Sequence, residues 1–190
     1  MSLSLVKPAR PQLSPAALRR IARGFAADRG LLARCPVDDR ERTWLRLPTG
    51  PDVAAWLIRW PAGTSTGWHD HIGADGRGVG GVFTVAAGEL TESWWSGHSV
   101  VRRTLSRGAL RSFGPDHVHN VAPAKTLGGG SGGSGDAGRA PAIAHPAGAE
   151  PALPAFSVHV YSPMLVAMRS YRIDAGRQLV LTGVGPLDEW

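Results

Sequence analysis

The sequence contains a single cysteine, Cys35, in 190 residues, and this scarcity excludes two kinds of protein. One cysteine cannot build an internal disulfide framework or a zinc cluster with several cysteine ligands. No run of about 18 apolar residues occurs, so we expect no transmembrane helix. The N-terminal stretch lacks the continuous apolar segment of a secretory signal, and we therefore expect a cytoplasmic protein.

Lysine is nearly absent as well, so arginine carries almost all of the positive charge. Lysine and arginine together number 21 against 15 acidic residues, which gives a formal net charge of +6. The arginines are scattered, and the aromatic residues are not interleaved with them as they are in surfaces that stack on bases. We expect no nucleic-acid partner, no membrane partner and a monomer.

Enough apolar sequence is present for one folded domain, since 43% of the residues are hydrophobic. We expect a flexible N-terminus over residues 1–13 and a single domain over residues 14–190. Residues 14–28 have helical periodicity, with Ser14 as the N-cap and Pro15 at the first helical position. Gly30 is expected to end this helix.

The pattern after residue 53 changes to short apolar segments separated by glycine and proline, which is typical of a β-sandwich or barrel. The expected strands are 54–60, 82–86, 89–95, 98–105, 109–113, 117–122, 155–162, 168–174 and 178–183. The Gly-rich segment 72–81 is expected to form a hairpin loop. Residues 124–154, rich in Gly, Ala and Pro and containing His145, are expected to form a disordered loop within the domain.

Histidine is the residue type that points to chemistry. His69 and His71 form one His-x-His pair, and His117 and His119 form another. Residues i and i+2 of a strand project from the same face, so each pair presents two imidazoles together. Two such strands facing each other in a small barrel could give three nitrogens to one iron, zinc, copper or nickel ion.

Three motifs carry a family resemblance. The first is His69-Asp70-His71 followed by Gly88-Glu89-Leu90-Thr91-Glu92, the second is GPDHVHNV at 114–121, and the third is SVHVYSP at 157–163. In this order they resemble the motifs of cysteine dioxygenases, a branch of the cupin superfamily, over about residues 40–172. The resemblance implies an all-β cupin jelly-roll barrel with an N-terminal helical segment.

The resemblance also implies a function, namely an Fe(II) enzyme that adds both atoms of O2 to a thiol sulfur and forms a sulfinic acid. It implies His69 and His71 as metal ligands and His119 as the third, with His117 as the alternative. It further implies that Tyr161 donates a hydrogen bond near the substrate and that a relay of Ser157 and His159 orients it. The expected partners are a small thiol and O2, and the expected cofactor is Fe(2+).

Substrate identity is left open by the motifs. The family places an arginine before the strand that precedes the His-Asp-His motif, and of Arg42 and Arg46 the latter matches this position better. An arginine can bind a carboxylate through two parallel hydrogen bonds. L-cysteine is the first choice, 3-mercaptopropionate is an alternative, and a non-catalytic metal-binding cupin is a third. Gly81 occupies the position at which animal members carry a cysteine linked to the tyrosine, so no such crosslink is expected.

Overall fold

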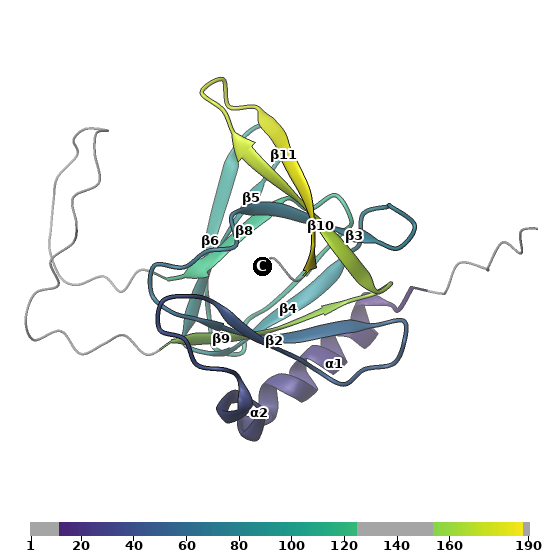
Figure 1. Cartoon of the computed structure of the whole chain (residues 1–190), viewed down its shortest axis with the longest axis vertical. Helices are drawn as coiled ribbons and strands as arrows, with labels where there is room; N and C mark the ends of the chain where they lie inside the picture. Colours follow the sequence, from purple (N-terminus) through teal and green to yellow (C-terminus); the bar gives the residue numbers. More distant parts are fainter. Residues whose placement is uncertain (1–11, 125–153, 188–190) are drawn as a thin grey trace, which may run out of the picture.

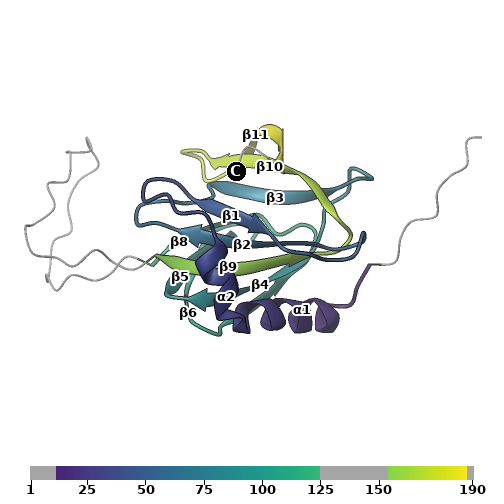
Figure 2. The same ribbon diagram turned by 60° about the horizontal axis from the view of Figure 1, so that its bottom comes forward.

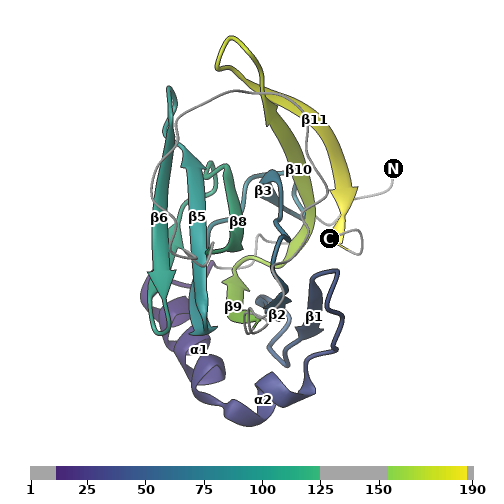
Figure 3. The same cartoon turned by 90° about the vertical axis from the view of Figure 1, so that its left-hand side faces the viewer.

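Eleven β-strands and two helices make up the described part of this computed structural model, residues 12–124 and 154–187 (Figure 1). The strands are β1 (Thr43–Arg46), β2 (Ala54–Trp60), β3 (Trp68–Gly73), β4 (Gly81–Ala87), β5 (Glu89–Trp95), β6 (Val100–Ser106), β7 (Leu110–Phe113), β8 (His119–Pro123), β9 (Ala155–Tyr161), β10 (Leu165–Ile173) and β11 (Leu179–Pro186). They form a five-stranded sheet of order β1-β2-β9-β4-β7 and a six-stranded sheet of order β11-β10-β3-β8-β5-β6. Figure 3 shows the larger sheet running from β6 to β11. The expected all-β jelly-roll barrel is confirmed.

The helices α1 (Pro15–Ala27) and α2 (Arg29–Arg34) cover the outer face of the five-stranded sheet (Figure 2). The predicted start of α1 is confirmed, because the Ser14 hydroxyl accepts a hydrogen bond from the Ala17 N–H at 3.3 Å. The helix ends at Ala27, within one residue of the predicted end, but Gly30 is not the residue that ends it. Asp28 leaves the helical conformation and caps α2 by accepting from the Gly30 N–H, so Gly30 lies inside a second helix.

Both faces of β2 are buried, which explains its apolar run from Ala54 to Ile58. Alternate residues of β2, among them Trp56 and Trp60, point into the barrel and pack with Phe83 and Tyr161. The intervening residues Ala55 and Leu57 pack against the helices. Because a strand covered on both sides needs no polar face, its sequence loses the alternation of a half-exposed strand. The sheet around β2, which is packed on both faces, forms one wall of the barrel.

The Gly-rich segment 72–81 does turn back on itself, with the Gly73 N–H bonded to the Arg77 carbonyl at 2.9 Å. However, β3 and β4 on either side belong to different sheets, so the segment carries the chain from one wall of the barrel to the other. It passes very close to the turn before β8. A Cβ built on Gly78 would lie 2.4 Å from the Pro115 carbonyl oxygen, so only glycine fits at this approach.

Most of the predicted strands are present, and the segments 54–60 and 89–95 match β2 and β5 in full. Strand β1 was not among the predicted segments. Leu13, in the segment predicted to be flexible, donates its backbone N–H to the Ser162 hydroxyl at 3.0 Å. Almost all of the predicted loop at 124–154, including His145, lies outside the described residues.

No helix in the described part is long and apolar enough to span a membrane.

We predict that Leu18→Ala destabilises the protein by about 2–5 kcal/mol, because Leu18 is only 3% exposed where α1 packs on the sheet. Chemical denaturation measures this change. Leu181→Ala is the matched control, since Leu181 is 53% exposed and its loss should change stability by less than about 0.5 kcal/mol. Equal effects of the two substitutions would contradict the packing role of α1.

Candidate metal centre

Three histidines meet inside the barrel, each contributed by the six-stranded sheet. His69 and His71 lie on β3 and His119 lies on β8, and one ligand nitrogen from each falls within 4.8 Å of the others. All three are buried. The expectation of strands facing each other across the barrel is wrong, because β3 and β8 are antiparallel neighbours in one sheet with His69 directly opposite His119. Direct cross-strand pairing is what brings the third imidazole close.

The hydrogen bonds of His69 and His119 to the surrounding protein are made through Nδ1. His69 donates Nδ1–H to the Gly67 carbonyl at 3.1 Å, and His119 donates Nδ1–H to Glu92 at 3.1 Å. Nε2 of His119 is buried without a hydrogen-bond partner. Because a buried polar atom without a partner is costly, a ligand nitrogen aimed at a metal is a physical reason for it. The cluster therefore fits a divalent transition metal.

Burial keeps the cluster in the protonation state that a metal requires. Desolvation lowers the pKa of His69, His71 and His119, and the neighbouring imidazoles lower the pKa of His69 and His71 further. The hydrogen bond to Glu92 opposes this effect at His119 only in part. All three rings are consequently neutral at pH 7, and no proton has to leave before a metal binds.

Glu92 is the residue that orients His119. Its carboxylate is fully buried on β5 and accepts hydrogen bonds from His119, His117 at 3.0 Å and Arg111 at 2.6 Å. Burial raises the pKa of Glu92, but these three partners outweigh it and hold the pKa well below its usual range. An ionised carboxylate behind a ligating histidine fixes the tautomer and direction of the ring.

His117 is thus placed apart from the cluster of His69 and His71. It belongs to a second group with Glu92 and His119, in which ligand atoms also lie within 4.8 Å of one another. Its ring stacks on Phe113 at 5.3 Å and is partly exposed. In that second group the Glu92 carboxylate already holds the Arg111 guanidinium, which disfavours a cation there.

A second hydrogen-bond chain runs along β9 and ends beside the cluster. The Trp60 indole N–H donates to the Ser157 hydroxyl at 2.8 Å, and Ser157 is 2.9 Å from His159 Nε2. His159 Nδ1 is 3.3 Å from the Tyr161 hydroxyl, which is 3.2 Å from His71 Nε2. The structure therefore brings together the three residues of the predicted relay and adds Trp60 to it.

The protonation states of His159 and Tyr161 determine which group donates in each of these hydrogen bonds. Burial lowers the pKa of His159 to about 3, so the ring is neutral, and it raises the pKa of Tyr161 far above neutrality. The neutral ring accepts the Ser157 hydroxyl proton at Nε2 and donates Nδ1–H to the Tyr161 oxygen. The Tyr161 O–H then donates to Nε2 of His71 at 3.2 Å, and it therefore points toward the three clustered histidines.

Gly81 makes room for Tyr161. The two residues are direct cross-strand partners on β4 and β9, and a Cβ on Gly81 would lie 2.7 Å from the tyrosine ring and 2.9 Å from Phe113. Any larger residue would push the ring away from His71. Cys35 is buried in the cluster between the helices and the sheet, on the opposite side of the sheet from Tyr161.

Asp70, between the two histidines of β3, makes its contacts outside the cluster. Its buried carboxylate accepts hydrogen bonds from Arg169 at 2.8 Å and Tyr171 at 2.9 Å, both on the neighbouring strand β10. This agrees with the alternation of a strand, which turns Asp70 away from the face that carries His69 and His71. The contacts tie β3 to β10.

The two candidate arginines lie on one face of the segment that forms β1. Trp44, midway between them, packs against the barrel interior, and Arg46 is opposite Trp56, whose ring meets Tyr161 at 5.8 Å. Arg46 itself is exposed. Arg42 is more deeply placed, with its guanidinium 5.5 Å from the centre of the Trp60 ring.

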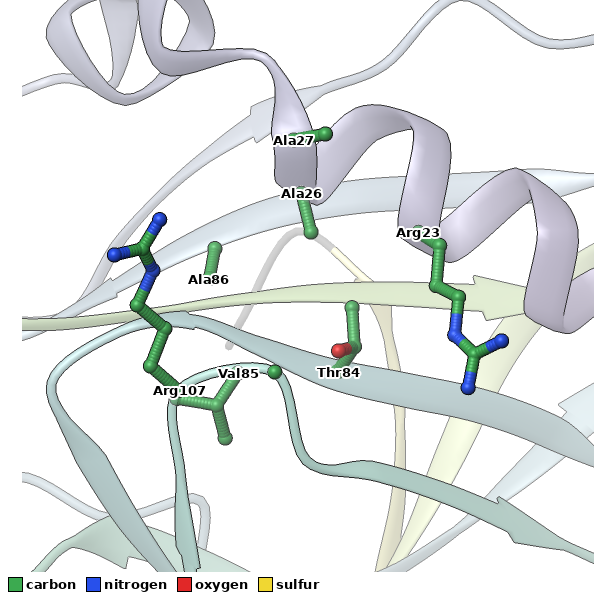
Figure 4. A pocket seen from close by; sticks show the side chains of 8 residues that line it. Arg23, Ala26, Ala27, Thr84, Val85, Ala86 and Arg107 are labelled. Atoms are coloured by element: carbon green, nitrogen blue, oxygen red, sulfur yellow. The ribbon is translucent and has the colours of Figure 1, made fainter.

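A cavity of about 280 Å³ lies elsewhere, between α1, β4 and the turn after β6 (Figure 4). Small side chains such as Ala26, Thr84 and Ala86 form its walls, and Arg23 and Arg107 flank it. Its lining residues include no histidine, cysteine or carboxylate, and it is separate from the clustered histidines.

Sequence reasoning assigned no role to Glu92, Arg111 or Trp60. Glu92 did carry a signal, because Leu90 two residues earlier is a core residue on the same face of β5. A glutamate at an inward position of a strand needs a buried partner. The identity of that partner depends on the pairing of β5 with β8 and could not be read from spacing.

We predict that His119→Ala abolishes stoichiometric metal binding, whereas His117→Ala retains it. The reason is that only His119 offers a nitrogen to the cluster of His69 and His71. Metal content after dialysis, and titration calorimetry with Fe(II) under anaerobic conditions, measure the effect. Loss of metal in His117→Ala with retention in His119→Ala would show instead that His117 is the third ligand.

Comparison with known proteins is consistent with this geometry. Residues 21–123 match the model of the family described as cysteine dioxygenase type I. No curated protein matches the sequence. Similar solved structures include KdgF from a Halomonas species (TM-score 0.44, 11% identity, 68% of this chain and 87% of the other). A second is an uncharacterised conserved protein with a double-stranded β-helix domain from Klebsiella pneumoniae (TM-score 0.45, 14% identity, 78% of this chain and 90% of the other). A third is a cupin superfamily protein from Desulfitobacterium hafniense (TM-score 0.45, 10% identity, 70% of this chain and 87% of the other). Since the matched residues make up more than half of its length, this chain belongs to the cysteine dioxygenase type I family.

Proposed function

We propose that this protein is an Fe(II)-dependent thiol dioxygenase that oxidises L-cysteine with O2 to cysteine sulfinic acid. The observation that carries the proposal is the position of the Tyr161 hydroxyl, 3.2 Å from a nitrogen of His71 within a cluster of three neutral imidazoles. A metal site that only binds or senses a ligand has no need of an oriented phenol O–H at this place.

The donor set supports iron in this role. When bound, Fe(II) on three neutral nitrogens keeps its full positive charge and has open positions for a thiolate and O2. Glu92 keeps the His119 ring in the ligating tautomer. All three histidines are buried inside the barrel, where electrostatic interactions with a bound substrate are stronger than in water.

Tyr161 acts as a hydrogen-bond donor in this proposal. Its raised pKa keeps the hydroxyl protonated, and the relay through His159 and Ser157 holds it in one orientation. It donates to the oxygen or sulfur atoms that gain negative charge as two S–O bonds form and the O–O bond breaks. The thiol proton and both oxygen atoms appear in the sulfinic acid, so no further reductant is needed.

Arg46 is proposed to bind the substrate carboxylate at the rim of the site. It shares the face of β1 that carries Trp44, and its partner across the strands, Trp56, contacts Tyr161. The same contact serves another small acidic thiol such as 3-mercaptopropionate, which is the alternative substrate. A non-catalytic metal-binding cupin is the alternative from a different class of function.

We predict O2 uptake by anaerobically Fe(II)-loaded protein when L-cysteine is added, with cysteine sulfinic acid as the product. 3-Mercaptopropionate and cysteamine are supplied in parallel, and cysteamine should be the poorest substrate because it lacks a carboxylate. His71→Ala should abolish uptake because it removes a metal ligand. An iron-loaded protein that takes up no O2 with any thiol would contradict the dioxygenase and favour the binding module.

We predict that Tyr161→Phe lowers turnover by about 10- to 100-fold while iron content stays unchanged, because only a hydrogen-bond donor is lost. Steady-state O2 consumption and metal analysis separate the two effects. Tyr171→Phe is a matched control that removes the other tyrosine hydroxyl, on the outer face of the sheet, and should leave turnover near that of the original protein. Equal turnover in Tyr161→Phe would exclude the proposed role of this hydroxyl.

A further inference from the structure

The two strands that carry the clustered histidines, β3 and β8, pair with each other at one position. His69 faces His119, and this is the single residue pair between the two strands. Strand β3 pairs with β10 at six positions and β8 pairs with β5 at five, so each is held mainly by its other neighbour. Because hydrogen bonds between strands fix their spacing, β3 and β8 need a further contact to keep their histidines at a constant distance.

Thr66, three residues before His69, supplies such a contact. Its backbone N–H donates to the Val121 carbonyl at 3.0 Å, and its hydroxyl oxygen accepts the Val121 N–H at 2.9 Å. In the register set by His69 and His119, residue 67 would face residue 121, but the backbone turns at Gly67, which has a φ of +69°. The Thr66 side chain therefore replaces the backbone carbonyl that a continued ladder would offer to Val121.

The same hydroxyl group also reaches the residue that orients His69. It donates to the Gly67 carbonyl at 2.9 Å, and this carbonyl accepts the Nδ1–H of His69 at 3.1 Å. The side-chain oxygen of Asn120, which follows His119 on β8, lies 3.3 Å from the hydroxyl. Since a hydroxyl can both accept and donate, one small group links the support of His69 to the strand that carries His119.

We propose that Thr66 is a positioning residue of the metal centre, and that its hydroxyl holds His69 and His119 at the separation that one metal ion requires. Val121 is completely buried, so its N–H has no access to water if the hydroxyl is removed. Strand β8 must then shift to find another acceptor, and His119, two residues away, moves with it. The proposal rests on the metal centre of the proposed function, but not on its thiol chemistry.

Metal affinity tests the hydroxyl directly, with Co(II) as the probe and a competing chelator to measure Kd. Thr66→Val keeps the shape of the side chain and removes the hydroxyl, and we expect it to raise Kd by about 10- to 100-fold. Thr66→Ser restores the hydroxyl and should bind within about threefold of the original protein. Thr64→Val is the matched control and should leave Kd unchanged, because the Thr64 hydroxyl donates within its own turn, to the Pro61 carbonyl at 2.7 Å.

The visible absorption of bound Co(II) gives a second measurement, since it depends on the geometry of the ligands. We expect the spectrum to change in Thr66→Val and to be restored in Thr66→Ser. An unchanged Kd and spectrum in Thr66→Val would overturn the proposal, whatever happens to stability. If Thr66→Ser loses affinity as Thr66→Val does, the hydroxyl is not the responsible group, and the proposal is overturned as well.

Unfolding temperatures separate positioning of the metal ligands from a general loss of stability. A bound metal stabilises the folded protein in proportion to the logarithm of its affinity, so weaker binding reduces the rise in Tm that Co(II) produces. We therefore expect Thr66→Val to lower Tm more in the Co(II)-loaded protein than in the metal-free protein. Equal lowering in the two forms would identify Thr66 as a purely structural residue.

Turnover distinguishes this proposal from the proposed reaction. If the original protein binds Fe(II) and Co(II) but oxidises no thiol, the dioxygenase fails, while the affinity and the spectrum still decide the role of Thr66. If L-cysteine is oxidised and Thr66→Val binds metal as the original protein does, the dioxygenase stands and this proposal fails. A protein that binds neither metal would overturn both.

Discussion

The burial of neutral imidazoles inside the barrel is the constraint on which the rest of the site depends. Desolvation keeps His69, His71, His119 and His159 unprotonated, and without it four clustered rings would repel one another as cations. Neutral rings must still satisfy their N–H groups. His69 does so through the Gly67 carbonyl, His119 through the Glu92 carboxylate and His159 through neighbouring side chains. Desolvation and hydrogen-bond satisfaction together aim the donors at one point.

The two sheets contribute differently to this arrangement. The six-stranded sheet carries the three clustered histidines and Glu92, while the five-stranded sheet carries Tyr161, its relay and the two arginines of the β1 segment. Helix α1 seals the outer face of the five-stranded sheet, so the relay on β9 rests on a wall packed from both sides. A wall of this kind can hold a hydroxyl group in one orientation, which a half-exposed strand with fraying hydrogen bonds would do less well.

The sequence predicted the fold class, and it pointed to every histidine of the cluster, because period-two spacing of histidines needs only local geometry. Spacing alone could not choose between His117 and His119, although the family resemblance favoured His119. The two residues are two positions apart, so on a strand both would point to the same face. However, β8 begins only at His119. What brings His119 to the cluster is its pairing with His69, 50 positions away along the chain. The strand partners of Glu92 were hidden for the same reason. Long-range register, which spacing does not encode, therefore limited the prediction.

Arginine side chains matter to this site because they pair with its buried carboxylates. Each buried carboxylate of the described chain is matched by an arginine, as in Glu92 with Arg111 and Asp70 with Arg169. Among the described residues Arg42 stands outside this matching, because its Nη1 is buried without a partner and its guanidinium lies over the Trp60 ring, so its charge interacts with an aromatic face and not with a carboxylate.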